Sequence, residues 1–481
     1  MTKAVWSVKV VLPQTLKPDQ KAFVVPHSTK QSVLFPELLS KPVHVRFDEP
    51  NTTSDGGALL LKSIDGKLGL TASLARCLAD PREPGKVQHQ LSDIIRQRVF
   101  GLCCGYSDTN DVARIGHDPM QKLLLGRDPL DGDDLASQPT LSRFENTRRR
   151  VDLFRLADTL AATVIRQHRY RLNGQKCKMV TIDMDPTDDP VHGAQQLSMF
   201  NGHYDARCYL PMLGFVSFND EPEQYLVAAM LRAGNAPTKQ GAIGILKRLI
   251  PELRMAFPFA WIRVRLDGGF ACPELFTFLE EQQVEYLVGM AKNSVLSKRS
   301  AAALAKAQGL FDENGETVPV FGEALYAAQK WHYLRRIIYK AEVVSHPGRD
   351  PRNNCRFVVT NMDEDPEAIY QIYRQRGDCE NRIKELKEGL YLDRLSCSSF
   401  WANQLRLLLV AAAYVLMQEL RLRMKATPLA RAQVETLRLQ LLKIGGQVKR
   451  SVRRIVIHLA ASHPWRRQWY KAARALGAAI P

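Results

Sequence analysis

The sequence lacks the short motifs of several common enzyme classes. It contains no Walker A lysine motif, no Gly-x-Ser-x-Gly elbow, no His-Glu-x-x-His and no paired Cys/His zinc spacing. Its nine cysteines, two of them adjacent at Cys103 and Cys104, form no Cys-x-x-Cys and no regular disulfide spacing. We therefore expect reduced thiols, a cytoplasmic location and no small-molecule cofactor.

The sequence also lacks a hydrophobic run of membrane-spanning length. The longest apolar run, residues 407–417, has eleven residues, whereas a helix needs about 20 to cross a bilayer. Residues 1–13 show no apolar segment of the kind that secretory signals contain. Membrane and secreted classes are therefore not expected.

Acidic residues are scarce near the end of the chain. The whole sequence has 67 Lys and Arg against 50 Asp and Glu, a net charge of +17. Residues 401–481 contain 15 Lys and Arg but two acids, so 13 of the 17 net charges fall in this part. Trp465, Trp469 and Tyr470 lie among these cations. A basic tail could serve solubility or an acidic membrane, but cations interleaved with aromatic rings favour a nucleic-acid partner.

The flanking regions of the chain are predicted to differ from its middle. At 481 residues there is room for several domains. Residues 1–57, rich in Pro and β-branched residues, predict an irregular arm with short strands. Residues 58–150 have helical apolar spacing and predict a helical DNA-binding region, in which 138–146 is either a recognition helix or a connecting helix. Residues 401–481 predict a basic helical C-terminal region.

The middle of the chain predicts a mixed α/β catalytic core. Three strands joined by short loops are followed by a helix, a strand, a second helix and another strand, at residues 178–185, 209–218, 225–231, 238–249, 261–267, 273–280 and 284–290. This order is that of an RNase H-like sheet. The core is expected to comprise residues 151–290 and 361–400, interrupted by a β-rich insertion at 291–360 just before its last helix.

Two acids directly follow predicted strands of this core. Asp185 precedes Pro186, which ends its strand, and Asp267 precedes a Gly-Gly turn. Asp183 and Asp188 are alternatives to the first acid, and acids after a strand are often ordinary loop residues. Together with a helical acid, two strand-end acids could bind Mg²⁺, which prefers hard oxygen ligands. Two such ions about 4 Å apart can activate a nucleophile and stabilise a leaving oxygen in phosphoryl transfer.

The helical acid is predicted in the last core helix, which begins at Asp365 and Pro366. Four side chains of this helix fall on one stripe within about 60°, namely Tyr373, Arg376, Glu380 and Lys387. One carboxylate is thus framed by groups that bind phosphate. The alternative is an amphipathic surface helix whose charges are merely solvated.

The spacing Tyr373-x2-Arg376-x3-Glu380-x6-Lys387 resembles the YREK signature of bacterial insertion-sequence transposases with a DDE catalytic triad. Asp185-Pro186-Thr187 is similar to the first catalytic region of that family, and Asp267-Gly-Gly-Phe to the second. The resemblance implies cut-and-paste transposition. In that reaction the ends of the element are hydrolysed and the freed 3′-OH attacks target DNA.

The same resemblance implies roles for individual residues. Two Mg²⁺ ions, or two Mn²⁺ ions in their place, would be held by the three acids Asp185, Asp267 and Glu380. DNA phosphates near the scissile bond would be held by Tyr373, Arg376 and Lys387.

The resemblance further implies an aromatic residue in the insertion that stacks on a flipped base. Trp331 is the matching candidate, and its alternative is a Trp in the core of the insertion. The implied partners are double-stranded DNA, as terminal inverted repeats and target, and a second copy of the chain in a homodimer. Two other functions stay open, a non-catalytic DNA-binding protein or repressor derived from such an enzyme, and a metal-dependent nuclease of the host.

Overall fold

The computed structural model describes residues 33–35, 40–173, 176–346 and 348–479, and it divides into two units at Pro50. In the first unit, β1 (Val33–Phe35) pairs antiparallel with β2 (Val43–Val45). Most of the irregular arm predicted for residues 1–57 lies outside the described residues. The second unit, Asn51–Pro481, contains all the candidate site residues.

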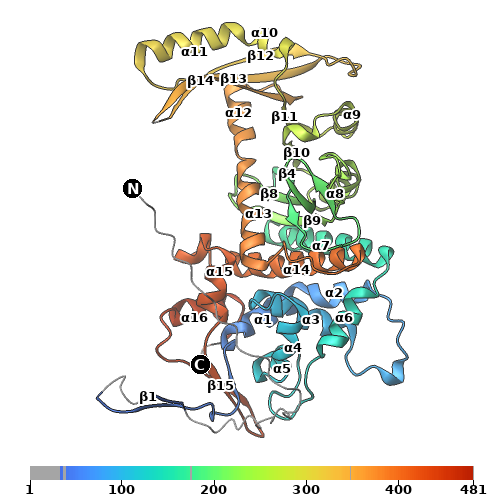
Figure 1. Ribbon diagram of the computed structural model, residues 1–481, viewed down its shortest axis with the longest axis vertical. Helices are drawn as coiled ribbons and strands as arrows, with labels where there is room; N and C mark the ends of the chain where they lie inside the picture. The colour runs from blue at the N-terminus through green and yellow to red at the C-terminus, as the bar shows by residue number, and fades with distance from the viewer. Residues whose placement is uncertain (1–32, 36–39, 174–175, 347, 480–481) are drawn as a thin grey trace, which may run out of the picture. The chain divides into compact units, whose positions relative to one another are not determined.

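An eight-stranded mixed sheet runs through the second unit (Figure 1). Its order is β12-β13-β14-β11-β10-β4-β8-β9, in which β4, β10 and β11 are parallel and all other neighbours are antiparallel. The strands are β4 (Met179–Pro186), β8 (Met212–Phe218), β9 (Tyr225–Met230), β10 (Trp261–Leu266), β11 (Glu285–Met290), β12 (Val320–Tyr326), β13 (Arg335–His346) and β14 (Arg349–Thr360). The five predicted core strands therefore form, with boundaries shifted by a few residues.

The connection between β4 and β8 is longer than the predicted short loop. It contains a separate three-stranded sheet in the order β5-β7-β6, made of β5 (Asp189–Pro190), β6 (Met199–Asn201) and β7 (Ala206–Tyr209). The single strand predicted at 209–218 is divided between β7 and β8 because Pro211 has no N–H to offer a ladder. The prediction of a short loop is wrong here.

The insertion at 291–360 extends the core sheet instead of forming a sheet of its own. Its last strand, β14, pairs antiparallel with β11, from Leu287 opposite Thr360 to Met290 opposite Phe357. The insertion also contains two helices, α10 (Ser294–Arg299) and α11 (Ala301–Asn314), and α11 packs on β12 and β13. The other face of these strands packs against α12 (Pro366–Arg374), as the cluster of Ile338, Val358, Ile369 and Tyr370 shows.

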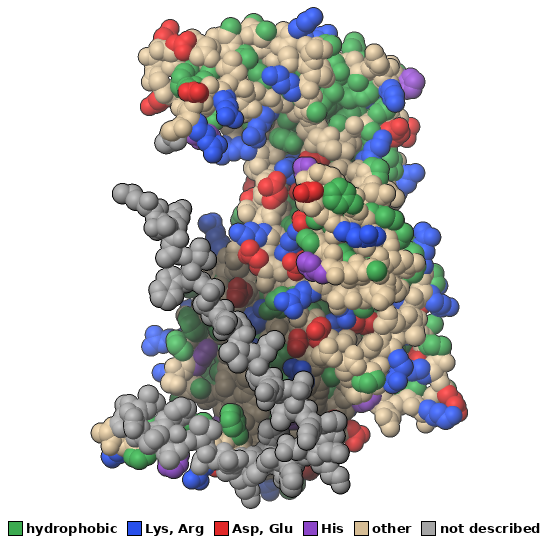
Figure 2. Space-filling model, in the orientation of Figure 1, with side chains coloured by type: hydrophobic (Ala, Val, Ile, Leu, Met, Phe, Trp, Pro, Cys, Tyr) green, Lys and Arg blue, Asp and Glu red, His purple; other side chains and the backbone are tan. Residues whose placement is uncertain are grey.

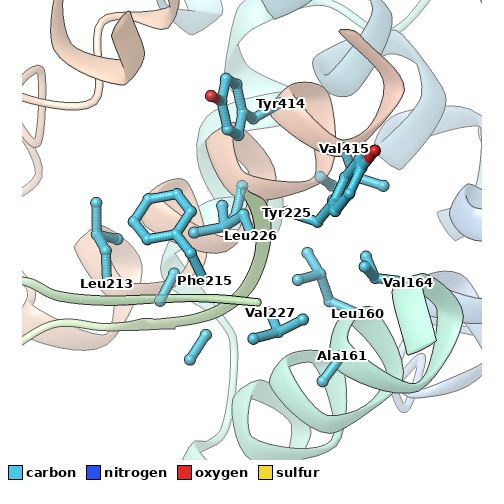
Figure 3. Close-up of a cluster of buried hydrophobic side chains, with 14 of the residues drawn as sticks. Leu160, Ala161, Val164, Leu213, Phe215, Tyr225, Leu226, Val227, Tyr414 and Val415 are labelled. Carbon is cyan, nitrogen blue, oxygen red and sulfur yellow. The ribbon is translucent and has the colours of Figure 1, made fainter. Parts of the chain in front are cut away.

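Two long helices, α7 (Arg150–Arg171) and α14 (Phe400–Arg423), pack against the edge strand β9. Figure 3 shows Leu160 and Val164 of α7 on the side of β9 that carries Tyr225 and Val227, and Tyr414 of α14 on the side that carries Leu226. Gln404 and Gln418 of α14 hydrogen-bond to backbone N–H and C=O groups of β9 and the residues flanking it. These bonds satisfy backbone groups that an edge strand would otherwise expose.

Helix α14 is longer and more apolar than the eleven-residue run indicates. It has 24 residues and an 18-residue window of mean hydropathy 1.4, so its length and composition alone would suit a membrane span. However, 89% of that window is buried inside the protein. It is therefore the central helix of this unit, covered by β9, α7 and α3 (Leu91–Cys103).

The region predicted at 58–150 contains six helices, and its DNA-binding role stays a prediction. The helices are α1 (Leu59–Leu68), α2 (Leu70–Arg76), α3, α4 (Thr109–Arg114), α5 (Pro119–Leu124) and α6 (Gln138–Asn146). Helix α6 is fixed to the core by Glu145, which accepts hydrogen bonds from Arg98 at 3.0 Å and from Arg406 at 2.7 Å. All nine cysteines lie in the described residues and are free thiols, as predicted.

The C-terminal region is not wholly helical, which corrects the prediction for residues 401–481. After α15 (Val434–Leu437) and a π-helical turn, β15 (Gly446–Arg450) and β16 (Ile455–Leu459) form a hairpin, followed by α16 (Arg466–Ala475). Strand β15 also pairs with β3 (Thr52–Thr53), so the two ends of this unit share a small sheet. Strand β16 contains the β-branched run Ile455-Val456-Ile457, which favours a strand over a helix.

Candidate active site

The two strand-end acids lie side by side at one edge of the sheet. In the parallel pair of β4 and β10, Met184 is opposite Leu266, so Asp185 and Asp267 follow at equivalent positions. Asp267 also caps the short 3₁₀ turn after β10, where its Oδ1 accepts from the Gly269 N–H at 2.9 Å. Asp185 is largely buried, with 9% of its surface exposed.

The helix predicted to carry the third acid is interrupted at its centre. As predicted, Asp365 caps its start by accepting from the Glu367 N–H at 3.0 Å. Helix α12 then ends at Arg374, and α13 (Gly377–Leu390) begins after a tight turn in which Arg376 N donates to Tyr373 O at 3.0 Å. The four predicted residues therefore lie on two consecutive helices with a junction at Arg376.

Arg376 joins two of the three acids. Its Nη1 lies 3.2 Å from Asp185 Oδ2 and its Nη2 lies 2.7 Å from Glu380 Oε1. The Glu380 side chain is 62% exposed, so this acid forms the outer side of the site. Within the described residues, no three acids, His or Cys converge at metal-binding distance; the Arg376 guanidinium lies between Asp185 and Glu380 instead.

The three acids nevertheless influence one another electrostatically. Burial, together with the negative charges of Asp267 and Glu380, raises the pKa of Asp185 to about 7 against the opposing charge of Arg376. A carboxylate with this environment is destabilised as an anion. A bound cation would remove that destabilisation.

Tyr373 lies over the glycines at the same edge of the sheet. A Cβ placed on Gly289 of β11 would be 2.5 Å from the Tyr373 hydroxyl and 3.0 Å from the Gly268 N. The absence of a side chain at Gly289 therefore lets the phenol approach the turn after Asp267. The Tyr373 hydroxyl therefore lies near the turn that follows Asp267, and the Tyr373 backbone is hydrogen-bonded to Arg376.

The alternative acids, Asp183 and Asp188, have other partners. Asp183 is fully buried and accepts from Arg265 Nε at 2.9 Å, Arg265 Nη2 at 2.7 Å and Gln224 Nε2 at 2.8 Å. Asp188 pairs with Lys387 Nζ at 2.8 Å. Asp185 is therefore the β4 acid that adjoins Glu380 through Arg376.

Arg265 is a site residue that the sequence analysis missed. Besides holding Asp183, its Nη1 donates to Ile372 O at 2.9 Å and to Gln375 Oε1 at 3.0 Å, both at the α12–α13 junction. One buried guanidinium thus links β4, β10 and the helix junction. The sequence did contain one sign of this link. Arg265 precedes Asp267 by two residues, just as Asp183 precedes Asp185 by two residues.

Lys387 shares a pocket with Glu380 but does not touch Arg376 or Asp185. The pocket is lined by Thr187, Glu380, Ile383, Lys384, Lys387, Glu388 and Asp393. Asp189 is 1% exposed, and its Oδ2 has no hydrogen-bond partner among the described residues. Burial, together with the charge of Asp393, raises the pKa of Asp189 to about 8 against the opposing charge of Lys387.

This pKa predicts that Asp189 makes the metal-free protein less stable as the pH rises. The folded state holds the proton more tightly than the unfolded chain, whose Asp pKa is about 3.9. The stabilising contribution is therefore complete below about pH 4 and is lost toward pH 8, at up to about 1.4 kcal/mol per pH unit. Urea unfolding in EDTA at pH 5 to 8.5 should show a smaller decline for Asp189→Asn than for the wild type. Parallel curves would contradict the assignment.

Trp331 lies in an aromatic cluster at the connection of β12 and β13. Its half-buried ring packs edge-on against Phe276 at 5.1 Å and Tyr326 at 5.6 Å between centroids, with the Arg335 guanidinium 5.4 Å above it. The ring also lines an open groove beside α8 (Ala242–Ala256) and α9 (Pro273–Glu281). These contacts do not bring Trp331 to the acids.

Several cations of residues 401–481 form ion pairs with acids elsewhere in the chain. Arg421 pairs with Glu223 at 2.7 Å and with Glu385, Lys443 pairs with Asp55 at 2.6 Å, and Arg450 pairs with Asp128 at 2.6 Å. Exposed cations remain on the β15–β16 turn and on α16, at Arg453, Arg454, Arg466, Arg467, Lys471 and Arg474. The charge count alone therefore overstates the basic surface of this region.

The chain belongs to the family described as transposase DDE domain group 1, whose model matches residues 35–479. This match spans nearly the whole chain and confirms the family that the Tyr373 to Lys387 spacing resembles. The protein is therefore a DDE-type transposase by family. No curated protein matches the sequence significantly.

Proposed function

We propose that the protein is an active DNA transposase that binds the ends of an insertion sequence and catalyses metal-dependent strand cleavage and strand transfer. The observation that carries this proposal is that Asp185 and Asp267 follow neighbouring parallel strands at equivalent positions, while Arg376 bridges Asp185 to Glu380 of α13. An inactive derivative would have no need to keep all three acids at one edge of the sheet.

We also propose that the core is RNase H-like. Five strands support this, in the order β9-β8-β4-β10-β11, with the first three antiparallel and the last two parallel to β4. In such a sheet the carboxyl ends of parallel strands meet at one edge, which is where Asp185 and Asp267 lie.

The residues fit a divalent metal. Asp185 is buried beside two other negative charges, and oxygen ligands of this kind suit Mg²⁺ or Mn²⁺. Asp185, Asp267 and Glu380 would hold two ions, which would activate the attacking water or 3′-OH and stabilise the leaving oxygen. Because Arg376 now occupies the space between Asp185 and Glu380, its guanidinium must move aside to admit them.

The other signature residues would hold the DNA backbone. Arg376, once displaced from the acids, could donate charge-assisted hydrogen bonds to a phosphate, and Tyr373 could donate through its hydroxyl. Lys387 lines the pocket beside Glu380 and would contribute a further positive charge. A stacking role for Trp331 stays a prediction, and the groove that it lines is where an extruded base could reach it.

The proposed partners are double-stranded DNA, as terminal inverted repeats and target, and a second copy of the chain. Two element ends must be held together during transposition, which a homodimer would do. We expect the protein to act on DNA in the bacterial cytoplasm.

Cleavage of the DNA that flanks the gene tests the proposed function. Purified protein and duplexes spanning each boundary of the element should give cuts that leave a 3′-OH at the element end, in Mg²⁺ or Mn²⁺ but not in EDTA. Specific binding without cleavage in either metal would favour the inactive DNA-binding derivative. Metal-dependent cutting with no preference for the element ends would favour the host nuclease.

Arg265 is proposed as a positioning residue for the three acids, acting through the α12–α13 junction. Gln375 is an exposed hydrogen-bond partner of Arg265. The substitution Gln375→Ala removes the 3.0 Å hydrogen bond from Arg265 and leaves the buried ion pair of Arg265 with Asp183 intact. We expect the cleavage rate at saturating DNA to fall about tenfold, with little change in DNA Kd or melting temperature. Gln371→Ala, one turn earlier on α12, is the matched control and should behave as the wild type. An unchanged rate in Gln375→Ala would contradict the positioning role.

A further inference from the structure

The β13–β14 hairpin reaches well past the core sheet. The last β11 residue, Met290, pairs with Phe357, but β13 and β14 continue together to the bulge that pairs His346 with Arg349. The paired segments 340–346 and 349–356, here called the hairpin arm, therefore extend roughly 25 Å beyond β11. They extend from the carboxyl end of β11, which is the same edge of the sheet that carries Asp185 and Asp267.

One face of the hairpin arm carries a row of cations. Val358 and Ile338 face α12 in a buried cluster, so alternation places Arg356, Arg352 and Lys340 on that same face. On the α12 side the row begins beside Tyr370, because the Lys340 Nζ lies 5.6 Å from the Tyr370 ring centroid. Figure 2 shows Lys and Arg side chains gathered along the underside of this hairpin, at the upper left of the view.

Of the acids on this face, Asp350 lies at the outer end of the arm and Glu342 is already neutralised. Glu342 pairs with Lys340 and accepts from Asn354 Nδ2 at 2.8 Å. Arg352 and Arg356 are exposed, and no acid in the described part of the chain forms an ion pair with either. Two guanidinium groups are thus presented to solvent without a partner of opposite charge.

The row of cations leads into the candidate active site. Tyr370, beside Lys340, is followed one turn later on α12 by Tyr373, at 6.3 Å between ring centroids. Tyr373 is in turn bonded through its backbone carbonyl to Arg376, which contacts Asp185 and Glu380. Groups suited to phosphate therefore continue from the acids, along α12, onto the hairpin arm.

We propose that this face of the hairpin arm is a track for the phosphates of a DNA duplex that extends away from the scissile bond. The proposal rests on the proposed function and adds where the uncleaved part of the duplex lies. A polyanion is favoured over an acidic protein surface because the row is continuous with residues suited to phosphate. Arg352 and Arg356 would each contact a phosphate by charge, without reading the base sequence.

Salt-dependent binding of the full-length protein tests the track. The double variant Arg352→Ala/Arg356→Ala should bind a long element-end duplex at least tenfold more weakly. The slope of log Kd against log salt should fall by about 1.8, or 0.9 for each lost phosphate contact. Arg352→Lys/Arg356→Lys should keep the slope. The cleavage rate at saturating DNA should be unchanged, since neither residue touches the acids.

A matched control removes the same number of positive charges from the two helices of the insertion, away from the face that carries the row of cations. Arg299→Ala/Lys306→Ala on α10 and α11 should leave both Kd and slope unchanged. If the double alanine variant still cleaves DNA and keeps the wild-type slope of log Kd against log salt, the proposed track is wrong. The proposed function would then still stand. A lower oligomer mass in that variant would assign the face to a second copy of the chain and would also overturn the track. A wild-type protein that neither binds nor cleaves element ends would overturn both.

Discussion

Glu380→Gln will abolish strand cleavage while leaving DNA binding close to that of the wild type. The amide keeps the shape of the side chain but removes the negative charge that a hard cation needs. Loss of groups that merely support a metal ligand costs 10- to 100-fold, so loss of a ligand should lower the cleavage rate by more than about 100-fold. Single-turnover cleavage of an element-end duplex in Mg²⁺ measures this effect. Asp185→Asn and Asp267→Asn should behave alike.

A second glutamate on the same helix serves as the control. Glu388 is exposed, lines the same pocket as Glu380 and pairs with Lys384 at 3.7 Å, so Glu388→Gln should retain cleavage. Asp183→Asn should act differently from Asp185→Asn, because it weakens a buried ion pair and lowers stability. Normal cleavage by Glu380→Gln would remove Glu380 from the triad, and normal cleavage by Asp185→Asn would remove Asp185.

Glu385→Ala will cost about 3 to 5 kcal/mol of folding free energy, the usual effect of leaving a buried charge without its partner. Glu385 is 4% exposed and sits on the inner side of α13. It accepts hydrogen bonds from Tyr414 Oη at 2.7 Å, Val434 N at 2.8 Å, Arg382 Nη1 at 3.1 Å and the Arg421 guanidinium. One carboxylate thus fixes the helix of Glu380 to α14 and to the C-terminal region.

Urea unfolding of the full chain measures this cost. Glu388→Ala, three residues along the same helix and exposed, should change the free energy of unfolding by less than about 0.5 kcal/mol. Glu385→Gln should lie between the two, since it keeps the volume but lacks the charge. A loss below about 1 kcal/mol in Glu385→Ala would show that the four contacts do not act as a buried network.

The core strands could be predicted because their residues alone favour strands. β8 and β9 are runs of apolar residues that pack on both faces, and β10 ends at Asp267 before two glycines. The family could also be predicted, because the spacing of Tyr373, Arg376, Glu380 and Lys387 is written in consecutive sequence. These features need no knowledge of distant contacts.

The features that the sequence analysis missed depend on distant partners. Arg265 becomes a link between strands and helices only when Asp183 and Gln375, far away in sequence, meet it. The charge of residues 401–481 seemed free because Arg421 and Lys443 find their acids elsewhere in the chain. The break at Arg376 interrupts a helical pattern that continues on both sides, so periodicity gives no sign of it.

The central claim is that Asp185, Asp267 and Glu380 together hold the metal ions of the reaction. Anomalous diffraction from crystals of the protein with a cleaved element-end duplex and Mn²⁺ tests it most directly. We predict Mn²⁺ peaks within about 2 to 2.3 Å of carboxylate oxygens of all three acids, with the Arg376 guanidinium turned to a DNA phosphate. Peaks that avoid any of these acids, or an Arg376 that still bridges Asp185 and Glu380 beside the bound DNA, would contradict the account.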